Sequence, residues 1–175
     1  MDFTNNYFEI FGLPVSYQVD LGLLSERYRE MQREFHPDRY ASKPAQEQRL
    51  AVQYAAVINQ AFSELQSPLL RAQYLLNLNN IESEGDAQIT RDPLFLMQQI
   101  ELREKLSDVA QSSDAFSMLE EVAEEAESEY TALQKVFDQQ YSQSQFQEAL
   151  ETIAKMQFFS KLLVEIEQRE HELEG

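Results

Sequence analysis

Apolar residues recur every three or four positions through most of this chain, a spacing that places them on one face of an α-helix. The clearest run follows Asp20, a residue type that caps helix N-termini. Its apolar positions are Leu21, Leu24, Tyr28, Met31 and Phe35. This helix must end before Pro37, because the proline ring excludes the helical conformation at His36 and offers no backbone N–H. We therefore predict a long helix over residues 21–35.

Further helical patterns flank this one. The apolar cluster from Tyr7 to Phe11 ends at Gly12-Leu13-Pro14, which predicts one or two helical turns and a stop. A loop from His36 to about Pro44 precedes a second long stripe, formed by Leu50, Tyr54, Val57, Ile58, Ala61 and Leu65. So short a connection favours antiparallel packing of the two long helices. Ser67-Pro68 then has the form of an N-cap and first helical residue, and opens a short helix through Leu76.

Three more helices are predicted beyond a polar stretch rich in Asn, Ser and Gly. Asp92-Pro93 opens the first, which should run to about Ala110. The second has a three-and-four spacing over about three heptads, typical of a coiled-coil-like bundle. Its stripe is Phe116, Leu119, Ala123, Ala126, Tyr130, Leu133 and Phe137. The third covers residues 145–172, and its apolar side holds Phe146, Leu150, Ile153, Met156 and Leu163.

The helix that begins at Pro93 carries apolar residues on two sides. At about 100° per residue, one narrow arc forms the predicted core side. This arc holds Phe95, Leu102, Leu106 and Val109. A nearly opposite arc beside Glu104 holds Leu96, Met97 and Ile100. Phe158 also falls off the core side of the last helix, so we predict an exposed apolar patch that binds a partner. The alternative is that these residues pack against the first half of the chain.

Composition and charge narrow the function classes. The chain has 175 residues, of which 43% are hydrophobic, four are Gly and five are Pro, which favours an all-α fold. A net charge of −17 argues against nucleic-acid and membrane-surface partners. Residues 1–80 carry seven basic and nine acidic side chains, whereas residues 81–175 carry seven and 22. This asymmetry predicts two domains, over residues 1–76 and 90–175, joined by a linker at 77–89.

Metal and cofactor chemistry is not expected. The chain has no Cys, and His36 and His171 are its only histidines, so we predict no metal site, no iron–sulfur ligation and no cofactor. The first residues lack the pattern of a secretion or transit signal, and no apolar run approaches the length of a membrane span. We expect a cytoplasmic protein, most simply a bacterial one.

The tripeptide His36-Pro37-Asp38 lies between the two long helices of the first half. It follows a helix that carries Arg27, Arg29 and Arg33, and it precedes Arg39. One interpretation is an ordinary turn in which Asp38 makes the side-chain hydrogen bond. On the same view the arginines only pair with Glu26, Glu30 or Glu34 along the helix.

The surrounding sequence favours a different interpretation. Together with Tyr7–Leu13, Tyr28 and Ile58–Leu65, the tripeptide resembles the J-domain of J-protein co-chaperones over residues 7–66. The resemblance implies docking onto a heat-shock ATPase chaperone and stimulation of its ATP hydrolysis. The contacts it implies are His36, Pro37 and Asp38, with Arg27, Arg29, Arg33 and Arg39 as electrostatic partners. Glu30 and Glu34 interrupt the basic face, so electrostatic steering should be weaker than in many J-domains.

The second half brings a more specific resemblance. The runs Phe95-Leu96-Met97, Glu101–Leu106 and Ser67–Leu76 resemble the HscB family, the J-type co-chaperones of iron–sulfur cluster assembly, from Tyr7 to about Leu163. This implies an L-shaped protein whose J-domain is an antiparallel helical hairpin with short flanking helices and engages an HscA-type chaperone. The C-terminal three-helix bundle would bind an IscU-type scaffold. The implied contacts are Leu96, Met97, Ile100 and Phe158, with Glu101 and Glu104 as polar ones.

The expected function is that of an adaptor without catalytic chemistry, which acts as a monomer or with weak self-association. It would deliver the scaffold to the ATPase and so promote the maturation of iron–sulfur proteins. The alternative is a general folding co-chaperone, against which the missing Gly/Phe-rich linker and Cys-rich zinc module argue. A hydrolase with paired carboxylates lacks a nucleophile, a metal set and a phosphate loop in this sequence.

Overall fold

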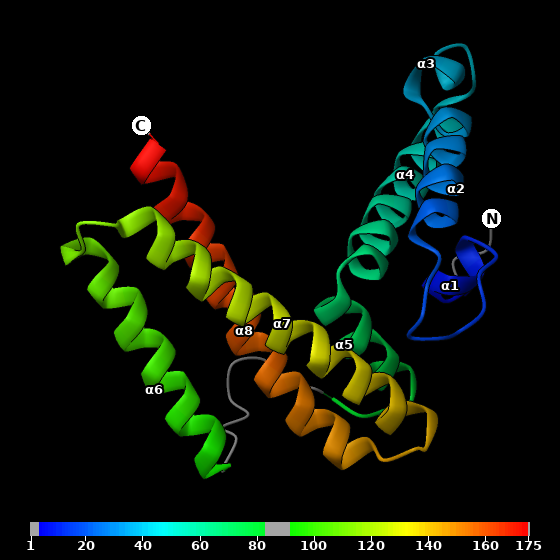
Figure 1. Cartoon of the computed structure of the whole chain (residues 1–175). Coiled ribbons are helices and arrows are strands. Elements are labelled where there is room, and N and C mark those ends of the chain that lie inside the picture. The colour runs from blue at the N-terminus through cyan, green and yellow to red at the C-terminus, as the bar shows by residue number, and fades with distance from the viewer. Residues whose placement is uncertain (1–3, 83–91, 175) are drawn as a thin grey trace. The chain divides into compact units, whose positions relative to one another are not determined.

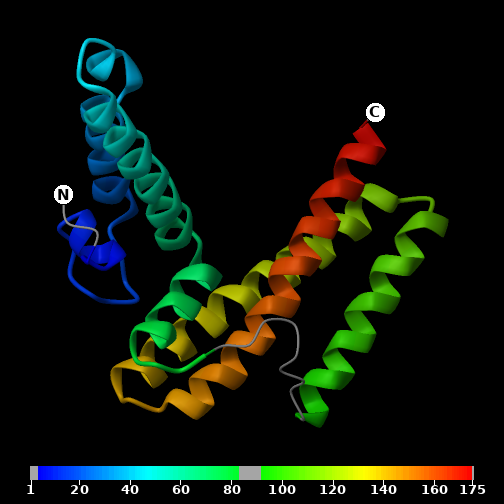
Figure 2. The same cartoon turned by 180° about the vertical axis from the view of Figure 1, so that it is seen from behind.

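The computed structural model describes residues 4–82 and 92–174 and is helical, without strands, over those ranges (Figures 1 and 2). The prediction of an all-α fold is confirmed. Tertiary contacts divide the chain into two compact units, unit 1 with residues 1–79 and unit 2 with residues 80–175. Most of the predicted linker, from residue 83 to 89, lies outside the described residues. Within the described ranges, no helix is long and apolar enough to cross a membrane.

Unit 1 is built on a pair of long antiparallel helices, visible as the blue and blue-green helices in Figure 1. Its elements are α1 (Tyr7–Ile10), α2 (Leu21–Glu34), α3 (Pro37–Tyr40), α4 (Ala45–Gln66) and α5 (Pro68–Leu78). Asp20 caps α2 as predicted, since its Oδ1 accepts a 2.9 Å hydrogen bond from the Leu23 amide. Helix α5 continues through Asn77 and Leu78, the two residues that were predicted to begin the linker.

The loop predicted between the two long helices contains a helical turn of its own. Residues Pro37–Tyr40 form α3, with His36 as its N-cap and Pro37 at its first position. Proline favours this position because its φ is already helical and the first N–H of a helix needs no intrahelical partner. The same proline therefore ends α2 and starts α3.

Aromatic and apolar contacts hold unit 1 together. Phe8, Leu24, Ile58 and Leu65 are almost completely buried, whereas Leu21 on the predicted α2 stripe is exposed at the first residue of its helix. The rings of Tyr7 and Tyr74 stack with centroids 4.4 Å apart, and the Tyr74 hydroxyl accepts a 2.9 Å hydrogen bond from the Tyr7 amide. Helix α5 is thereby fixed to α1 within unit 1.

Unit 2 is a bundle of α6 (Pro93–Asp108), α7 (Ala115–Ser142) and α8 (Phe146–Glu174), with a 3-10 turn at Val109–Gln111 after α6. Asp92 caps α6 as predicted, because its Oδ1 accepts hydrogen bonds from the amides of Leu94 at 3.1 Å and Phe95 at 3.4 Å. Helices α7 and α8 run antiparallel side by side (Figure 2).

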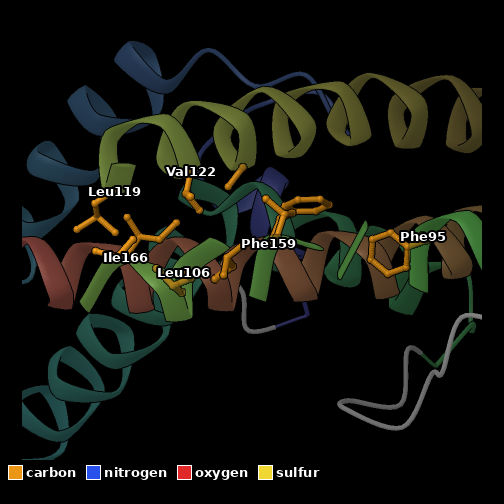
Figure 3. Close-up of a cluster of buried hydrophobic side chains, with 10 residues drawn as sticks. Phe95, Leu106, Leu119, Val122, Phe159 and Ile166 are labelled. Atoms are coloured by element: carbon orange, nitrogen blue, oxygen red, sulfur yellow. The ribbon is translucent and has the colours of Figure 1, made fainter. Parts of the chain in front are cut away.

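The core shared by the three helices is a row of buried side chains, with Leu119 and Ile166 at one end and Phe95 at the other (Figure 3). Its members are Phe95, Leu102, Leu106, Val109, Leu119, Val122, Ala126, Phe159, Leu162 and Ile166. All four residues that were assigned to the core side of α6 belong to it. On α7, Val122 is buried while Phe116, predicted on the buried stripe, is exposed one residue after the helix begins.

Candidate partner-binding surfaces

The His36-Pro37-Asp38 turn presents its polar side chains to solvent. The side chain of His36 is 57% exposed and that of Asp38 is 92% exposed. The Nδ1 atom of His36 accepts a 3.2 Å hydrogen bond from the Asp38 amide, so the imidazole rather than the carboxylate closes the turn. The Asp38 carboxylate lies 3.6 Å from the same nitrogen and keeps most of its surface open to a partner.

Neighbouring aromatic residues hold this turn in place. Phe35, the buried C-cap of α2, lies 5.1 Å from the Tyr54 ring of α4 and 6.5 Å from the Tyr40 ring of α3, measured between centroids. Gln48 of α4 donates to the carbonyl oxygens of Lys43 at 2.8 Å and Ala41 at 3.3 Å. Both ends of the turn are therefore tied to the helical hairpin.

A hollow of about 930 Å³ leads from this turn along α2 and α4. Its lining brings together five of the seven candidate chaperone contacts, His36, Pro37, Arg29, Arg33 and Arg39. The buried side chains of Phe35 and Ile58 underlie it, and Glu26 and Glu30 interrupt the basic side. The sequence pattern assigned Ile58 to the core, and this is confirmed: the side chain is buried between the two helices beneath the hollow.

Arg27 does not belong to this basic side. Its Nη1 donates to the carbonyl oxygens of Phe11 and of Gly12, the latter at 2.7 Å. Arg27 precedes Arg29 by two residues, which is about 200° around the helix. Its guanidinium braces the turn after α1, outside the lining of the hollow, and the contact of Arg27 with the chaperone stays a prediction.

The other arginines of α2 are not paired along their helix. Arg29 donates from Nε to the Ser25 carbonyl at 3.2 Å. Within the described part of the chain, neither Arg29 nor Arg33 forms an ion pair with Glu26, Glu30 or Glu34. Their charges remain available at the surface of the hollow.

Unit 2 exposes the apolar residues that were predicted to form a patch on α6. Leu96 is 41% exposed, Met97 57% and Ile100 58%, and Glu101 and Glu104 are exposed beside them. Phe158 is only half-exposed, because its ring packs edge-on against Phe95 and Phe159 and lies under the Arg103 guanidinium at 5.6 Å. The expectation that Phe158 stands clear of the core is thus only partly right.

These candidates are distributed over two hollows on either side of α6. The first, about 510 Å³, is lined by Ile100, Glu104 and Phe158 among others. The second, about 470 Å³, lies between α6 and α7 and includes Met97 and Glu101. Leu96 lines neither hollow.

Charged side chains tie α6 to its neighbours at both ends. At the start, Lys155 donates a 2.7 Å hydrogen bond to Asp92. This bond, with those from the α6 backbone, lowers the pKa of the Asp92 carboxyl below its usual value.

Near the other end of α6, Glu165 of α8 accepts hydrogen bonds from Arg103 and Arg169. Arg169 also donates to the Leu106 carbonyl at 2.5 Å. Partial burial alone would raise the pKa of Glu165, but the two guanidinium groups outweigh it and lower the pKa.

A third tie joins α6 to α7. Lys105 donates a 2.6 Å hydrogen bond to Glu125, which raises the pKa of the lysine. The described residues contain no group of three or more His, Cys, Asp or Glu side chains that could hold a metal ion.

Comparison with known proteins places this architecture in one family. Residues 91–167 match the family model described as the HSCB C-terminal oligomerisation domain. The chain is 42% identical over 170 residues to a co-chaperone protein HscB homolog of Vibrio campbellii, covering 97% of this chain and 99% of that one. It superposes on chaperone HscB from Vibrio cholerae with a TM-score of 0.87 and 38% identity, covering 97% and 99% of the two chains. Human co-chaperone HscB gives a TM-score of 0.89 at 27% identity, with 97% and 84% covered. Since the identity extends over nearly the whole length of its bacterial relatives, the chain belongs to the HscB family of co-chaperones.

Proposed function

We propose that this protein is a co-chaperone of iron–sulfur cluster assembly in the bacterial cytoplasm. Unit 2 binds an IscU-type scaffold, and unit 1 engages an HscA-type ATPase chaperone and stimulates its ATP hydrolysis. The observation that carries the proposal is the exposed His36-Pro37-Asp38 turn at the end of an arginine-lined hollow, in a chain of the HscB family.

The geometry of unit 1 supports a docking role. Arg29, Arg33 and Arg39 offer charge-assisted hydrogen bonds to carboxylates of a partner. His36 and Asp38 lie on a turn held by aromatic contacts, so little conformational entropy is lost when a partner binds them. No catalytic step is assigned to this chain; the ATPase supplies the chemistry and the turn favours its active state.

The exposed side of α6 supports a client-binding role for unit 2. Leu96, Met97 and Ile100 leave apolar area in water that a folded partner would cover. A scaffold held there meets the chaperone bound to the same chain at a high effective concentration. Coupling of the two partners thus requires only that both bind at once.

A general folding co-chaperone is the alternative. It would bind denatured chains at least as well as a folded scaffold, and its stimulation of the ATPase would not depend on the scaffold. The adaptor proposal predicts instead that the folded scaffold binds better than denatured chains, and that stimulation of the ATPase depends on the scaffold.

The deciding experiment measures ATP hydrolysis by the HscA-type chaperone with this protein, with the IscU-type scaffold, and with both. Synergy of the two is expected, and additive rates would contradict the adaptor role. His36→Gln should abolish stimulation and leave the helical circular dichroism unchanged. His171→Gln, the same substitution in α8, serves as the matched control and should stimulate normally. Stimulation retained in His36→Gln would refute the role of the turn.

A further inference from the structure

The partner surface of unit 2 does not lie on one side of α6. Met97 and Glu101 line the hollow between α6 and α7. Ile100, Glu104 and Phe158 line the hollow on the other side of the helix. The two hollows share no lining residue, so a partner that contacts both sets must straddle α6. Such a partner also reaches α7, a helix to which no binding residue has been assigned so far.

The hollow between α6 and α7 has an apolar floor and one apolar rim. Phe95 and Phe159 at its base are almost completely buried, and Leu133 of α7 is half-buried beside them. The α6 rim is formed by Leu94, which is 78% exposed, and by Met97. Aliphatic side chains of a bound segment would gain free energy by leaving water at this rim.

The opposite wall is acidic. Glu125 and Glu129 of α7 face the hollow together with Glu101 of α6. Glu125 is occupied by its ion pair with Lys105. In residues 92–174, by contrast, neither Glu101 nor Glu129 forms a hydrogen bond or an ion pair with another described side chain. Glu101 and Glu129 are therefore carboxylates without an ion pair in this hollow, because the ammonium of Lys155, which also lines it, is bound to Asp92 and that of Lys105 to Glu125. The net charge of the unit is −15.

We propose that the α6–α7 hollow is a second contact site for the scaffold, and that it receives a segment carrying Lys or Arg next to aliphatic residues. The cationic group binds between Glu101 and Glu129, and the aliphatic groups pack on Leu94, Met97 and Leu133. This inference rests on the proposed function, because it specifies the partner chemistry at the same surface. A second copy of this chain is the poorer occupant, since two copies of unit 2, each with a net charge of −15, repel each other.

The test compares two charge reversals on α7. Glu129→Lys places a cation inside the hollow, whereas the exposed Glu127→Lys makes the same change about 200° around the helix. With IscU-type scaffold titrated calorimetrically into the full-length protein, Glu129→Lys should raise Kd by about tenfold or more and Glu127→Lys by less than about twofold. Glu129→Gln, which keeps the side-chain volume, should weaken binding less and should reduce the salt dependence of Kd. Circular dichroism melting of each variant verifies folding.

Leu96→Ala separates this inference from the function on which it rests. If Leu96→Ala weakens scaffold binding and Glu129→Lys matches Glu127→Lys, the second contact site is wrong and the scaffold-binding role survives. If the wild-type protein binds no scaffold, both the second contact site and the scaffold-binding role are refuted. If Glu129→Lys leaves scaffold affinity unchanged but alters the sedimentation of the protein alone, the occupant is a second copy and the inference is overturned.

Discussion

Lys155 of α8 donates a 2.7 Å hydrogen bond to Oδ2 of Asp92, while Oδ1 of the same carboxylate caps α6. One side chain thus orders the first turn of α6 and fixes that turn to α8. The arrangement bears on the proposed scaffold site because Leu96 and Met97 follow within the next turn. Their position relative to the rest of unit 2 depends on this anchor.

The anchor should weaken in acid. The hydrogen bond from Lys155 lowers the pKa of Asp92 most, and the one from the Phe95 amide lowers it further. The ionised form of this carboxyl is therefore more stable in the folded protein than in the unfolded chain. The stabilising contribution is complete above the ordinary value of 3.8 and is lost as the pH falls through the lower folded value. Amide hydrogen exchange in α6 should therefore be faster in Asp92→Asn than in the wild type at pH 6, and the difference should shrink toward pH 3. A difference that is independent of pH would contradict this account.

Truncation of a side chain in the core of unit 2 should lower its free energy of unfolding substantially. Leu102 is completely buried among the side chains of the three helices, whereas Leu94 on the same helix is largely exposed. Leu102→Ala leaves a cavity and should lower the free energy of unfolding of unit 2 by about 2–5 kcal/mol. Leu94→Ala should change it by less than about 0.5 kcal/mol. Urea unfolding followed by circular dichroism measures both, and equal effects would mean that the buried face of α6 is misassigned.

Removal of Arg27 should lower the stability of unit 1, whereas removal of Arg29 should lower its affinity for the chaperone. Arg27 binds the carbonyl oxygens of the turn at Gly12, whose φ is +60°. Arg27→Ala should therefore destabilise unit 1 by about 1–3 kcal/mol, because it leaves the partly buried Phe11 carbonyl without this donor. Arg29→Ala should keep the melting temperature and lower the affinity for the ATPase chaperone. Thermal melts and ATPase titrations of the two variants test this pair.

Gly12 provides an independent check on the same turn. A Cβ atom at this position would lie 2.8 Å from Nη1 of Arg27, in a backbone region that disfavours L-residues other than glycine. Gly12→Ala should cost about 1–2 kcal/mol of unfolding free energy. If Gly12→Ala were neutral in chemical denaturation, the tight contact between this turn and Arg27 would be refuted.

Helix periodicity was enough to predict the helices because each long helix has its own apolar stripe and several have a capping side chain. Asp20, Ser67 and Asp92 cap helices as predicted, and the two arcs of α6 separate into buried and exposed sets. These are properties of one helix and its immediate neighbours. They follow from spacing alone.

The details that periodicity missed depend on long-range contacts. Arg27 differs from Arg29 only in which element it faces, and the turn at Gly12 lies 15 residues away. The hollow between α6 and α7 requires Glu129 and Met97 to be neighbours, which no pattern within one helix reveals. Glu125 and Glu129 are half-buried at that hollow, although the other acids of α7 from Glu120 to Glu127 are exposed.

Phe158 and Ile100 line the same hollow but should respond differently to truncation. Ile100 is 58% exposed, so Ile100→Ala should keep stability and weaken scaffold binding. The ring of Phe158 packs on Phe95 and Phe159, so Phe158→Ala should weaken binding and also lower the melting temperature by several degrees. Melting curves and scaffold titrations of both variants separate the two effects. An unchanged melting temperature in Phe158→Ala would mean that its ring contributes nothing to the core.

Glu165 should influence the scaffold site without touching the scaffold. It accepts hydrogen bonds from Arg103 and Arg169, and the Arg103 guanidinium covers the Phe158 ring at the edge of the hollow. Because Glu165 and Arg103 are partly exposed, solvent screens their ion pair, and Glu165→Gln should cost no more than about 1 kcal/mol of unfolding free energy. Its effect on scaffold affinity should nevertheless exceed that of Glu167→Gln, an exposed control on the same helix, because Arg103 loses the partner that orients it over Phe158. High salt should reduce the difference between the two variants, since it screens the ion pair in the wild type as well. Equal scaffold affinities for Glu165→Gln and Glu167→Gln at low salt would show that Arg103 is held over Phe158 without Glu165.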